Sequence, residues 1–185
     1  KAMDIPAYIL DSDENIAMEQ TDRAIKEAYK NNTPVVIAVR KNTFDQYSSS
    51  KDRVDLPLSR EDAIIKCSEE LDENSVVVCT TGMPSRELFE FRSSSHQGHH
   101  RDFLTVGGMG HASQIALGIA SVKKDSKVFC FDGDGAALMH MGSFAIVGQS
   151  SAANLVHILF NNGVHDSVGG QPTVGFKVNF CEIAK

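Results

Sequence analysis

The chain has 185 residues, of which 42% are hydrophobic and 23% are charged, and its formal net charge is −6. This length suffices for one α/β core with a smaller appended piece, and the negative charge argues against a broad surface for nucleic acid or anionic membranes. No apolar stretch approaches the ~20 residues of a membrane span, and no signal peptide is visible. Because the net charge is negative, any site that binds an anion must be local and built from backbone N–H groups, a metal and a few side chains.

The first 47 residues are expected to be the tail of a preceding domain. Residues 15–32 have helical spacing, Thr33-Pro34 ends this helix, and residues 35–39 are a short β-branched strand. The chain turns polar from residue 41, and residues 48–58, with their serine run, are expected to be a linker. A chain that begins in this way is expected to be an excerpt, truncated at both ends, of a longer polypeptide.

Residues 59–185 are expected to form one α/β domain. Ser59 can cap a helix that reaches Leu71. Strands are then expected at 75–80, 103–106, 128–132 and 155–160, with helices starting at Arg86 and Ala112 and a single helix over 138–150; residues 89–102 are expected to be irregular. This alternation predicts an open, mostly parallel sheet flanked by helices on both faces, a Rossmann-like three-layer fold with its site at the carboxyl edge.

Two polar motifs follow two of these strands. Gly133-Asp134-Gly135 ends one strand, and Asn161-Asn162 ends the next after 25 intervening residues. A right-handed crossover makes the strands parallel and brings both motifs to one sheet edge, where neighbouring strands lie ~4.8 Å apart. A carboxylate and an amide oxygen there can share Mg²⁺, while the glycines let a diphosphate approach backbone N–H groups. The spacing therefore predicts a site for a diphosphate and Mg²⁺.

This pair of motifs resembles the thiamine diphosphate motif of the thiamine-dependent decarboxylase and acetolactate synthase superfamily. The resemblance implies that Asp134, Asn162 and the backbone carbonyl of Val164 bind Mg²⁺. It also implies that the turn at Gly133 admits the diphosphate and that the N–H groups of Gly135 and Ala136 bind it. The cofactors implied are thiamine diphosphate and Mg²⁺.

Two further glycine turns fall where this superfamily binds the cofactor. The resemblance implies that Thr81 and Gly82 touch the diphosphate. In the turn of Gly107, Gly108 and Met109, it implies backbone bonds to the aminopyrimidine from the Gly107 carbonyl and the Met109 N–H, with the Met109 side chain wedged under the bent cofactor. Taken alone, these glycines would equally suit close packing of a helix on the sheet.

A narrower resemblance, over residues 58–185, is to the phosphonopyruvate decarboxylases, with the sulfopyruvate decarboxylases as close relatives. It is carried chiefly by Asp102–Gly107 and by His165–Thr173. It implies decarboxylation of a small 2-oxo acid, 3-phosphonopyruvate, to phosphonoacetaldehyde and CO₂ in phosphonate biosynthesis. The N-terminal extension favours this fused form over the two-subunit sulfopyruvate enzymes, which remain the alternative.

The superfamily also uses a glutamate from a pyrimidine-binding domain, usually of a second subunit. None of the glutamates in this chain lies in a matching motif. The resemblance therefore implies at least a homodimer, and the chain alone is predicted to be inactive.

Several polar residues are further candidates for the site. His165 can contact the substrate or move a proton, or it can serve the structure of the loop, and Ser167 is a second substrate candidate. Arg86 can hold a phosphonate through a fork of bonds, or it can be a solvated residue at a helix start. Asp166 and Gln171 are weaker candidates. Residues 174–176 are expected to be a mobile segment hinged at Gly169-Gly170.

Other histidines and the cysteines have structural interpretations. His96, His99 and His100 are expected to line the mouth of the site rather than to bind zinc, and His157 is expected to be a core histidine with a satisfied hydrogen bond. The scattered cysteines, which are Cys67, Cys79, Cys130 and Cys181, are expected to be free thiols in a reducing cytoplasm.

Two other function classes remain as alternatives. A non-catalytic dinucleotide-binding module is disfavoured because no G-x-G-x-x-G motif follows a strand. An acetolactate-synthase-like ligase would need a flavin-type middle domain or a carboligation pocket, for which the sequence gives no sign.

Overall fold

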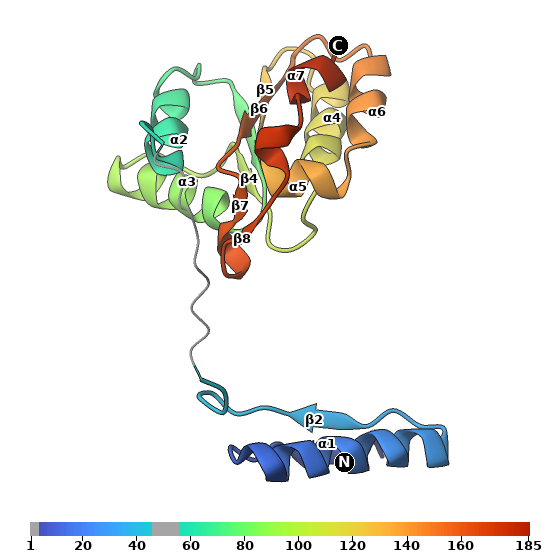
Figure 1. The fold of residues 1–185 in the computed structure, drawn as a ribbon. Coiled ribbons are helices and arrows are strands. Elements are labelled where there is room, and N and C mark those ends of the chain that lie inside the picture. The colour runs from blue at the N-terminus through green and yellow to red at the C-terminus, as the bar shows by residue number, and fades with distance from the viewer. Residues whose placement is uncertain (1–3, 46–55) are drawn as a thin grey trace. The chain divides into compact units, whose positions relative to one another are not determined.

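The computed structural model describes residues 4–45 and 56–185, and the chain divides into two compact units, residues 1–53 and 54–185 (Figure 1). Each unit is described by itself. Most of the linker expected at residues 48–58 lies outside the described residues.

The first unit is a small strand–helix–strand piece. It contains β1 (Ala7–Ile9), α1 (Glu14–Asn31) and β2 (Val36–Ala38), and the two strands pair in parallel. The Asp13 side chain caps α1, and Asn32, with φ of 49°, ends it in the left-handed conformation before Thr33-Pro34. The predicted helix and second strand are confirmed. Strand β1 was not predicted, because three residues are too short for a periodic pattern.

The second unit has the predicted α/β fold. Its main sheet is parallel, in the order β4-β3-β5-β6, and a small antiparallel pair, β7-β8, follows it. The elements of this unit are α2 (Arg60–Glu69), β3 (Val76–Cys79), α3 (Met83–Ser94), β4 (Asp102–Leu104), α4 (Ala112–Val122), β5 (Val128–Gly133), α5 (Asp134–Met139), α6 (Ser143–Gln149), β6 (Leu155–Phe160), β7 (Val164–His165), η1 (Asp166–Val168), β8 (Gln171–Pro172), η2 (Gly175–Lys177) and α7 (Phe180–Ile183).

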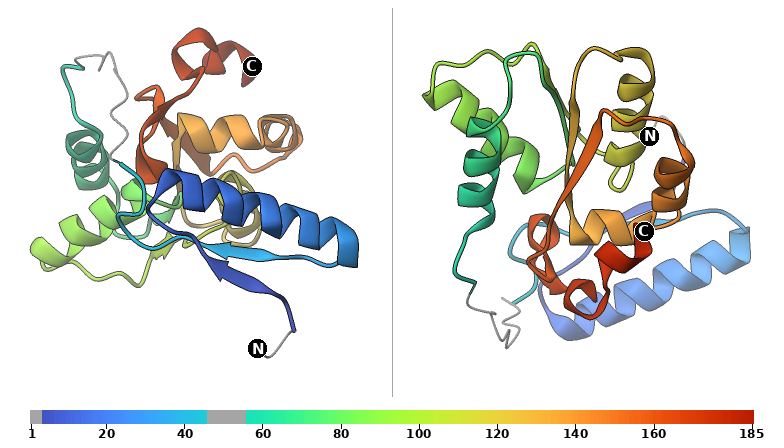
Figure 2. Two further views of the ribbon diagram at one scale, coloured as in Figure 1. Left: turned by 60° about the horizontal axis from the view of Figure 1, so that its bottom comes forward. Right: turned by 90° about the horizontal axis from the view of Figure 1, so that it is seen from above.

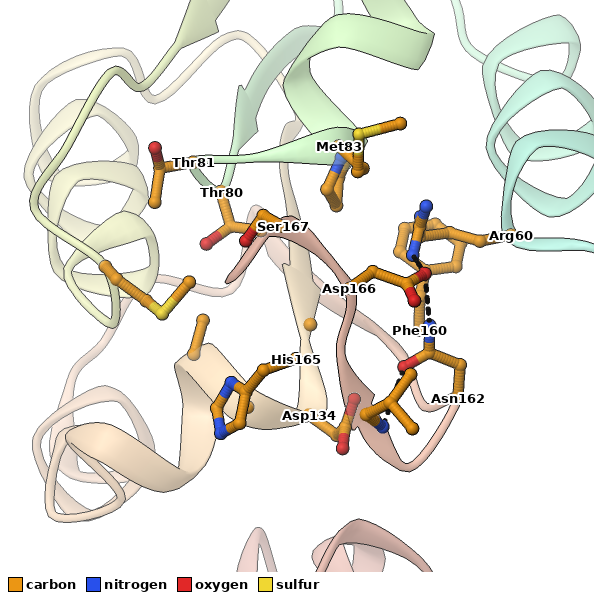
Figure 3. A pocket seen from close by; sticks show the side chains of 16 residues that line it. Arg60, Thr80, Thr81, Met83, Asp134, Phe160, Asn162, His165, Asp166 and Ser167 are labelled. Carbon is orange, nitrogen blue, oxygen red and sulfur yellow. Dashed lines mark hydrogen bonds and ion pairs between the residues drawn. The ribbon is translucent and has the colours of Figure 1, made fainter. Parts of the chain in front are cut away.

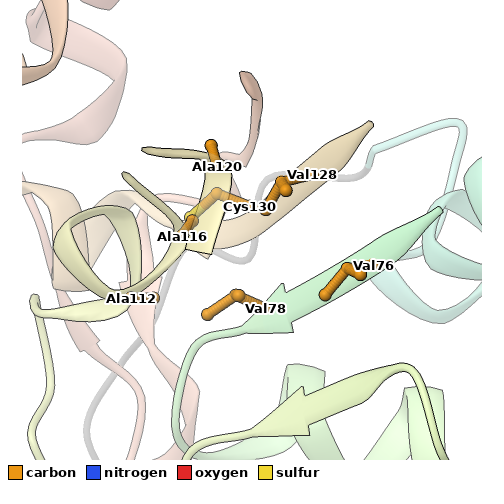
Figure 4. Close-up of a cluster of buried hydrophobic side chains, with 7 residues drawn as sticks. All are labelled: Val76, Val78, Ala112, Ala116, Ala120, Val128 and Cys130. Carbon is orange, nitrogen blue, oxygen red and sulfur yellow. The ribbon is translucent and has the colours of Figure 1, made fainter. Parts of the chain in front are cut away.

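Helices cover both faces of the main sheet. Figure 1 and the right-hand view of Figure 2 show α2 and α3 on one face and α4 and α6 on the other. Strand β3 is buried throughout, so its side chains alternate between two cores. Val76 and Val78 pack with the alanines of α4 and with Val128 and Cys130 of β5 (Figure 4). On the other face, Val77 and Cys79 pack with Ile64, Leu88 and Phe131. These two cores fix the strand ends that carry the polar motifs.

Two sequence predictions about helices are wrong. Helix α3 begins at Met83, with Pro84 in its first turn, and runs to Ser94, so much of the stretch 89–102 is helical. Leu88 is fully buried and Phe91 packs on the same core, which stabilises the helix beyond its weak sequence pattern. The single helix expected over 138–150 is two helices, α5 and α6, because the backbone leaves helical geometry at His140 (φ −133°, ψ 49°).

The cysteines lead to a prediction about reactivity. All four thiols are free; Cys79 and Cys130 are fully buried, whereas Cys181 is exposed. Burial raises the pKa of Cys79 to about 12 and raises the pKa of Cys130 further, so neither forms the reactive thiolate near pH 8. We expect a disulfide reagent to label Cys181 at once and Cys79 and Cys130 only after unfolding. Peptide mapping before and after denaturant checks this, and prompt labelling of Cys79 or Cys130 in the native protein would contradict it.

Within the described ranges, no helix combines the length and apolar character needed to cross a membrane.

Candidate active site

The candidate site is a pocket at the carboxyl edge of the main sheet, where β3, β5 and β6 end (Figure 3). The residues that line it come from the start of α2, from the ends of β3, β5 and β6, from the first turns of α3 and α5, from the turn before α4, and from the segment after β6. They are Arg60, Thr80, Thr81, Met83, Pro84, Met109, Gly133, Asp134, Gly135, Ala136, Phe160, Asn162, Val164, His165, Asp166 and Ser167.

Most of the residues predicted for the site lie together in this pocket. The predicted residues that line it are Thr81, Met109, Gly133, Asp134, Gly135, Ala136, Asn162, Val164, His165 and Ser167. Gly82, Gly107 and Gly108 do not line it, but all three have positive φ, as tight turns require. The N–H of Gly107 donates to the Thr81 hydroxyl at 2.9 Å, so the two glycine turns are joined.

Asp134 is a buried carboxylate at the centre of the site. Its residue is 2% exposed, and its carboxylate accepts a hydrogen bond from the Thr173 hydroxyl. Among the described residues, no lysine, arginine or histidine forms an ion pair with it. Burying a carboxylate without a cationic partner is costly, so this position fits a bound cation. The amide of Asn162 and the backbone of Val164 bring further oxygen donors to the same pocket, a set that fits Mg²⁺.

His165 faces the pocket from β7. A Cβ added to Gly135 would lie 2.4 Å from the His165 ring, so the ring packs directly over the first turn of α5. A larger residue at position 135 would displace this ring. Ser167 lies across the pocket, within 3.1 Å of the position that a Cβ on Gly82 would take.

Arg60 is a site residue that sequence reasoning missed. Its guanidinium donates to both carboxylate oxygens of Glu87, at 2.9 and 2.7 Å, and to Asp166 at 2.7 Å. The hydrogen bonds that Arg60 donates to Glu87 raise its pKa; burial acts against this shift and the contact with Asp166 adds to it, so Arg60 stays charged. Its place at the start of α2 was predictable, but its partners are 27 and 106 residues away along the chain, and no local pattern indicates them.

Arg86 and three of the histidines do not lie in the pocket. Arg86 is exposed on α3 and is absent from the lining, as expected of the solvated alternative. His96, His99 and His100 precede β4, which places them at the amino edge of the sheet, so the expectation that they line the mouth is wrong. His99 instead stacks on Phe89, with ring centroids 4.3 Å apart.

His157 has the satisfied hydrogen bond that was predicted. Its Nε2 lies 3.2 Å from Oδ2 of Asp132 on the neighbouring strand. With Cys130 these residues form the one cluster of three metal-ligating side chains found among the described residues, and it is separate from the pocket lining. Oδ1 of Asp132 accepts from the N–H of Gly133, so the pair supports the turn that carries Asp134.

Comparison with known proteins assigns the region that contains the pocket to a family. Residues 80–185 match the family described as "Thiamine pyrophosphate enzyme, C-terminal TPP binding domain", in which thiamine pyrophosphate is another name for thiamine diphosphate. The matched region contains every pocket-lining residue except Arg60.

Several relatives align over two thirds of the chain. A phosphonopyruvate decarboxylase of Streptomyces viridochromogenes is 40% identical over 122 residues, which cover 66% of this chain and 29% of the relative. A sulfopyruvate decarboxylase subunit beta of Methanocaldococcus jannaschii is 36% identical over 127 residues, 68% of this chain and 64% of the relative. The sulfopyruvate decarboxylase of Methanosarcina acetivorans is 33% identical over 67% of this chain and 30% of its own length.

The chain thus aligns with less than a third of the length of the Streptomyces and Methanosarcina enzymes, and with 64% of the length of the Methanocaldococcus beta subunit. Because a long chain also occurs under the sulfopyruvate name, the N-terminal extension does not distinguish the two substrates, contrary to expectation. The family match covers more than half of the chain. The chain therefore belongs to the thiamine pyrophosphate enzymes and carries their C-terminal thiamine pyrophosphate-binding domain.

Proposed function

We propose that this chain supplies the diphosphate- and Mg²⁺-binding half of the active site of a thiamine diphosphate-dependent decarboxylase that acts on 3-phosphonopyruvate. The observation that supports this most directly is the buried carboxylate of Asp134, which forms no ion pair with any described residue and shares a pocket with Asn162. The relatives named phosphonopyruvate decarboxylase and sulfopyruvate decarboxylase support the reaction class.

Each part of the pocket has a role in this proposal. Asp134, the side-chain oxygen of Asn162 and the Val164 carbonyl hold Mg²⁺, and the N–H groups of Gly135 and Ala136 bind the diphosphate. Met109 shapes the cofactor from the turn tied to Thr81. When bound, thiamine diphosphate supplies the electron sink that a 2-oxo acid needs to lose CO₂. His165 faces the substrate and holds or delivers a proton from its ring, and Ser167 hydrogen-bonds the substrate.

The remaining half of the site lies outside this chain in the proposal. A pyrimidine-binding domain of a second subunit supplies the activating glutamate, so the assembly is at least a homodimer and this 185-residue chain alone is inactive. The four free thiols are consistent with a cytoplasmic location.

Sulfopyruvate is the second candidate substrate, because its decarboxylases align at similar identity. The two substrates differ in the charge and geometry of the tail. We expect the intact protein to show kcat/KM at least about 10-fold higher for 3-phosphonopyruvate, the size of effect that one polar contact can give. The measurement is CO₂ release with each substrate at saturating Mg²⁺ and thiamine diphosphate. A preference for sulfopyruvate would reassign the substrate, and turnover of neither would overturn the proposed function.

A further inference from the structure

We propose that the segment after the asparagine pair, residues 163–175, supplies the outer shell of the metal site: Thr173 orients the carboxylate of Asp134, and Asp166 orients the amide of Asn162. The inference rests on the proposed Mg²⁺ site. It assigns positioning roles to two residues that do not themselves bind the metal.

The hydrogen bonds of Thr173 determine the direction of its hydroxyl. The N–H of Gly175 donates to the Thr173 hydroxyl oxygen at 3.0 Å, and the hydroxyl donates to Oδ2 of Asp134. The backbone N–H of Thr173 donates to the Gly163 carbonyl at 2.7 Å, which fixes the residue itself. One carboxylate oxygen of Asp134 is thereby held by the protein, so Oδ1 is the oxygen left to point at a cation.

Asp166 holds Asn162 in a corresponding way. Nδ2 of Asn162 donates to Oδ2 of Asp166 at 3.0 Å, so the nitrogen end of the amide is turned toward Asp166. The same Asp166 oxygen accepts from Arg60 at 2.7 Å (Figure 3). Arg60 is held along its other edge by Glu87. The oxygen end of the amide accepts a hydrogen bond from the Val164 N–H at 3.2 Å. Its second lone pair is then the part of the amide that can face a cation, and oxygen is the atom that Mg²⁺ requires.

Thr173 and Asp166 lie on the same segment as the two residues proposed to contact the substrate. His165 and Ser167 lie on the same segment, between Asn162 and Thr173. Metal binding therefore favours the conformation in which these side chains face the pocket, and, by linkage, ordering of the segment favours metal binding. Outer-shell partners of metal ligands typically change metal affinity by about 10–100-fold when removed.

The test compares two substitutions at Thr173 in the intact protein. Thr173→Val keeps the shape and removes the hydroxyl, and Thr173→Ser keeps the hydroxyl. Calorimetry measures the Mg²⁺ concentration that gives half-maximal thiamine diphosphate binding. We expect this concentration to rise about 10–100-fold in Thr173→Val and to stay near wild type in Thr173→Ser. Asp166→Ala is expected to behave like Thr173→Val, and Asp166→Asn, which keeps an acceptor for Asn162, to recover part of the affinity.

The control removes a hydroxyl elsewhere at the sheet edge. Thr105 is buried and donates to the Cys79 carbonyl at 2.9 Å, but it does not line the pocket. Thr105→Val should lower thermal stability without changing the Mg²⁺ requirement. If wild type shows Mg²⁺-dependent binding and Thr173→Val matches it, the inference is overturned while the proposed function stands. If wild type itself shows no Mg²⁺-dependent binding, the proposed function fails and this inference fails with it.

Discussion

Asp134→Ala is expected to abolish Mg²⁺-dependent binding of thiamine diphosphate, with an affinity loss of at least about 100-fold. The substitution removes the buried carboxylate that faces the pocket and has no cationic partner among the described residues. Without it, Mg²⁺ loses its one anionic protein ligand in the proposed set, and the diphosphate loses the cation that bridges it to the protein. Calorimetric titration of the intact protein with thiamine diphosphate, with Mg²⁺ and with EDTA in its place, measures the effect.

Loss of the Asp134 charge should weaken cofactor binding but should not lower the thermal stability of the ligand-free protein. Asp134→Asn keeps an acceptor for the Thr173 hydroxyl and removes a buried charge, so we expect a melting temperature, without ligands, equal to or above that of wild type. Asp72→Ala is the matched control, because Asp72 is exposed and forms a loose ion pair with Lys127 at 3.6 Å. Unchanged cofactor affinity in Asp134→Ala would contradict the proposed metal site. Binding of NAD by the wild-type protein would favour the dinucleotide-binding alternative.

The sequence predicted that the Gly133–Gly135 and Asn161-Asn162 motifs meet at one sheet edge, because that geometry follows from chain topology. Strands β5 and β6 pair in parallel with Gly133 opposite Phe160, so the residues that follow each strand must meet at one edge. The same argument placed the turn after β3 beside them. Because the distance between neighbouring strands is fixed and the crossover is right-handed, the spacing of the two motifs along the chain is enough to predict that they lie side by side. This prediction requires no knowledge of side-chain packing.

The rest of the site depends on contacts that no local pattern contains. Arg60 contacts Asp166, which lies 106 residues further along the chain. The sequence contains several other arginines, and its pattern indicated Arg86 rather than Arg60 as the candidate for binding the substrate phosphonate. The extension of α3 to Ser94 is stabilised by the packing of Leu88 and Phe91 in the core rather than by propensity, and the break between α5 and α6 at His140 is not marked in the sequence by a proline. The positioning role inferred for Thr173 likewise depends on where residues 163–175 fold back.

Gly175→Ala is expected to weaken Mg²⁺-dependent cofactor binding about 10–100-fold, a loss comparable to that of an outer-shell residue. A Cβ at this position would lie 2.4 Å from Oδ2 of Asp134 and 2.5 Å from Oδ1 of Asn161. Neither neighbour can move freely, since Asp134 is bonded to Thr173, and Asn161 is bonded to the Gly163 N–H and the Gly175 carbonyl. The added methyl group must therefore push the proposed metal ligand or the segment around residue 175 out of place.

The same substitution should also destabilise the fold, because overpacking at a filled site costs about 1–3 kcal/mol. Thermal unfolding without ligands measures the loss of folding stability, and the Mg²⁺ titration measures the loss of Mg²⁺-dependent cofactor affinity. Gly148→Ala is the matched control: Gly148 lies in α6, and an added Cβ would meet no atom within 4 Å. There the methyl group should be neutral or stabilise the protein by up to about 1 kcal/mol. If Gly175→Ala matched Gly148→Ala in both measurements, residues 173–175 would not pack on the metal ligand in solution, and the positioning role of Thr173 would lose its structural basis.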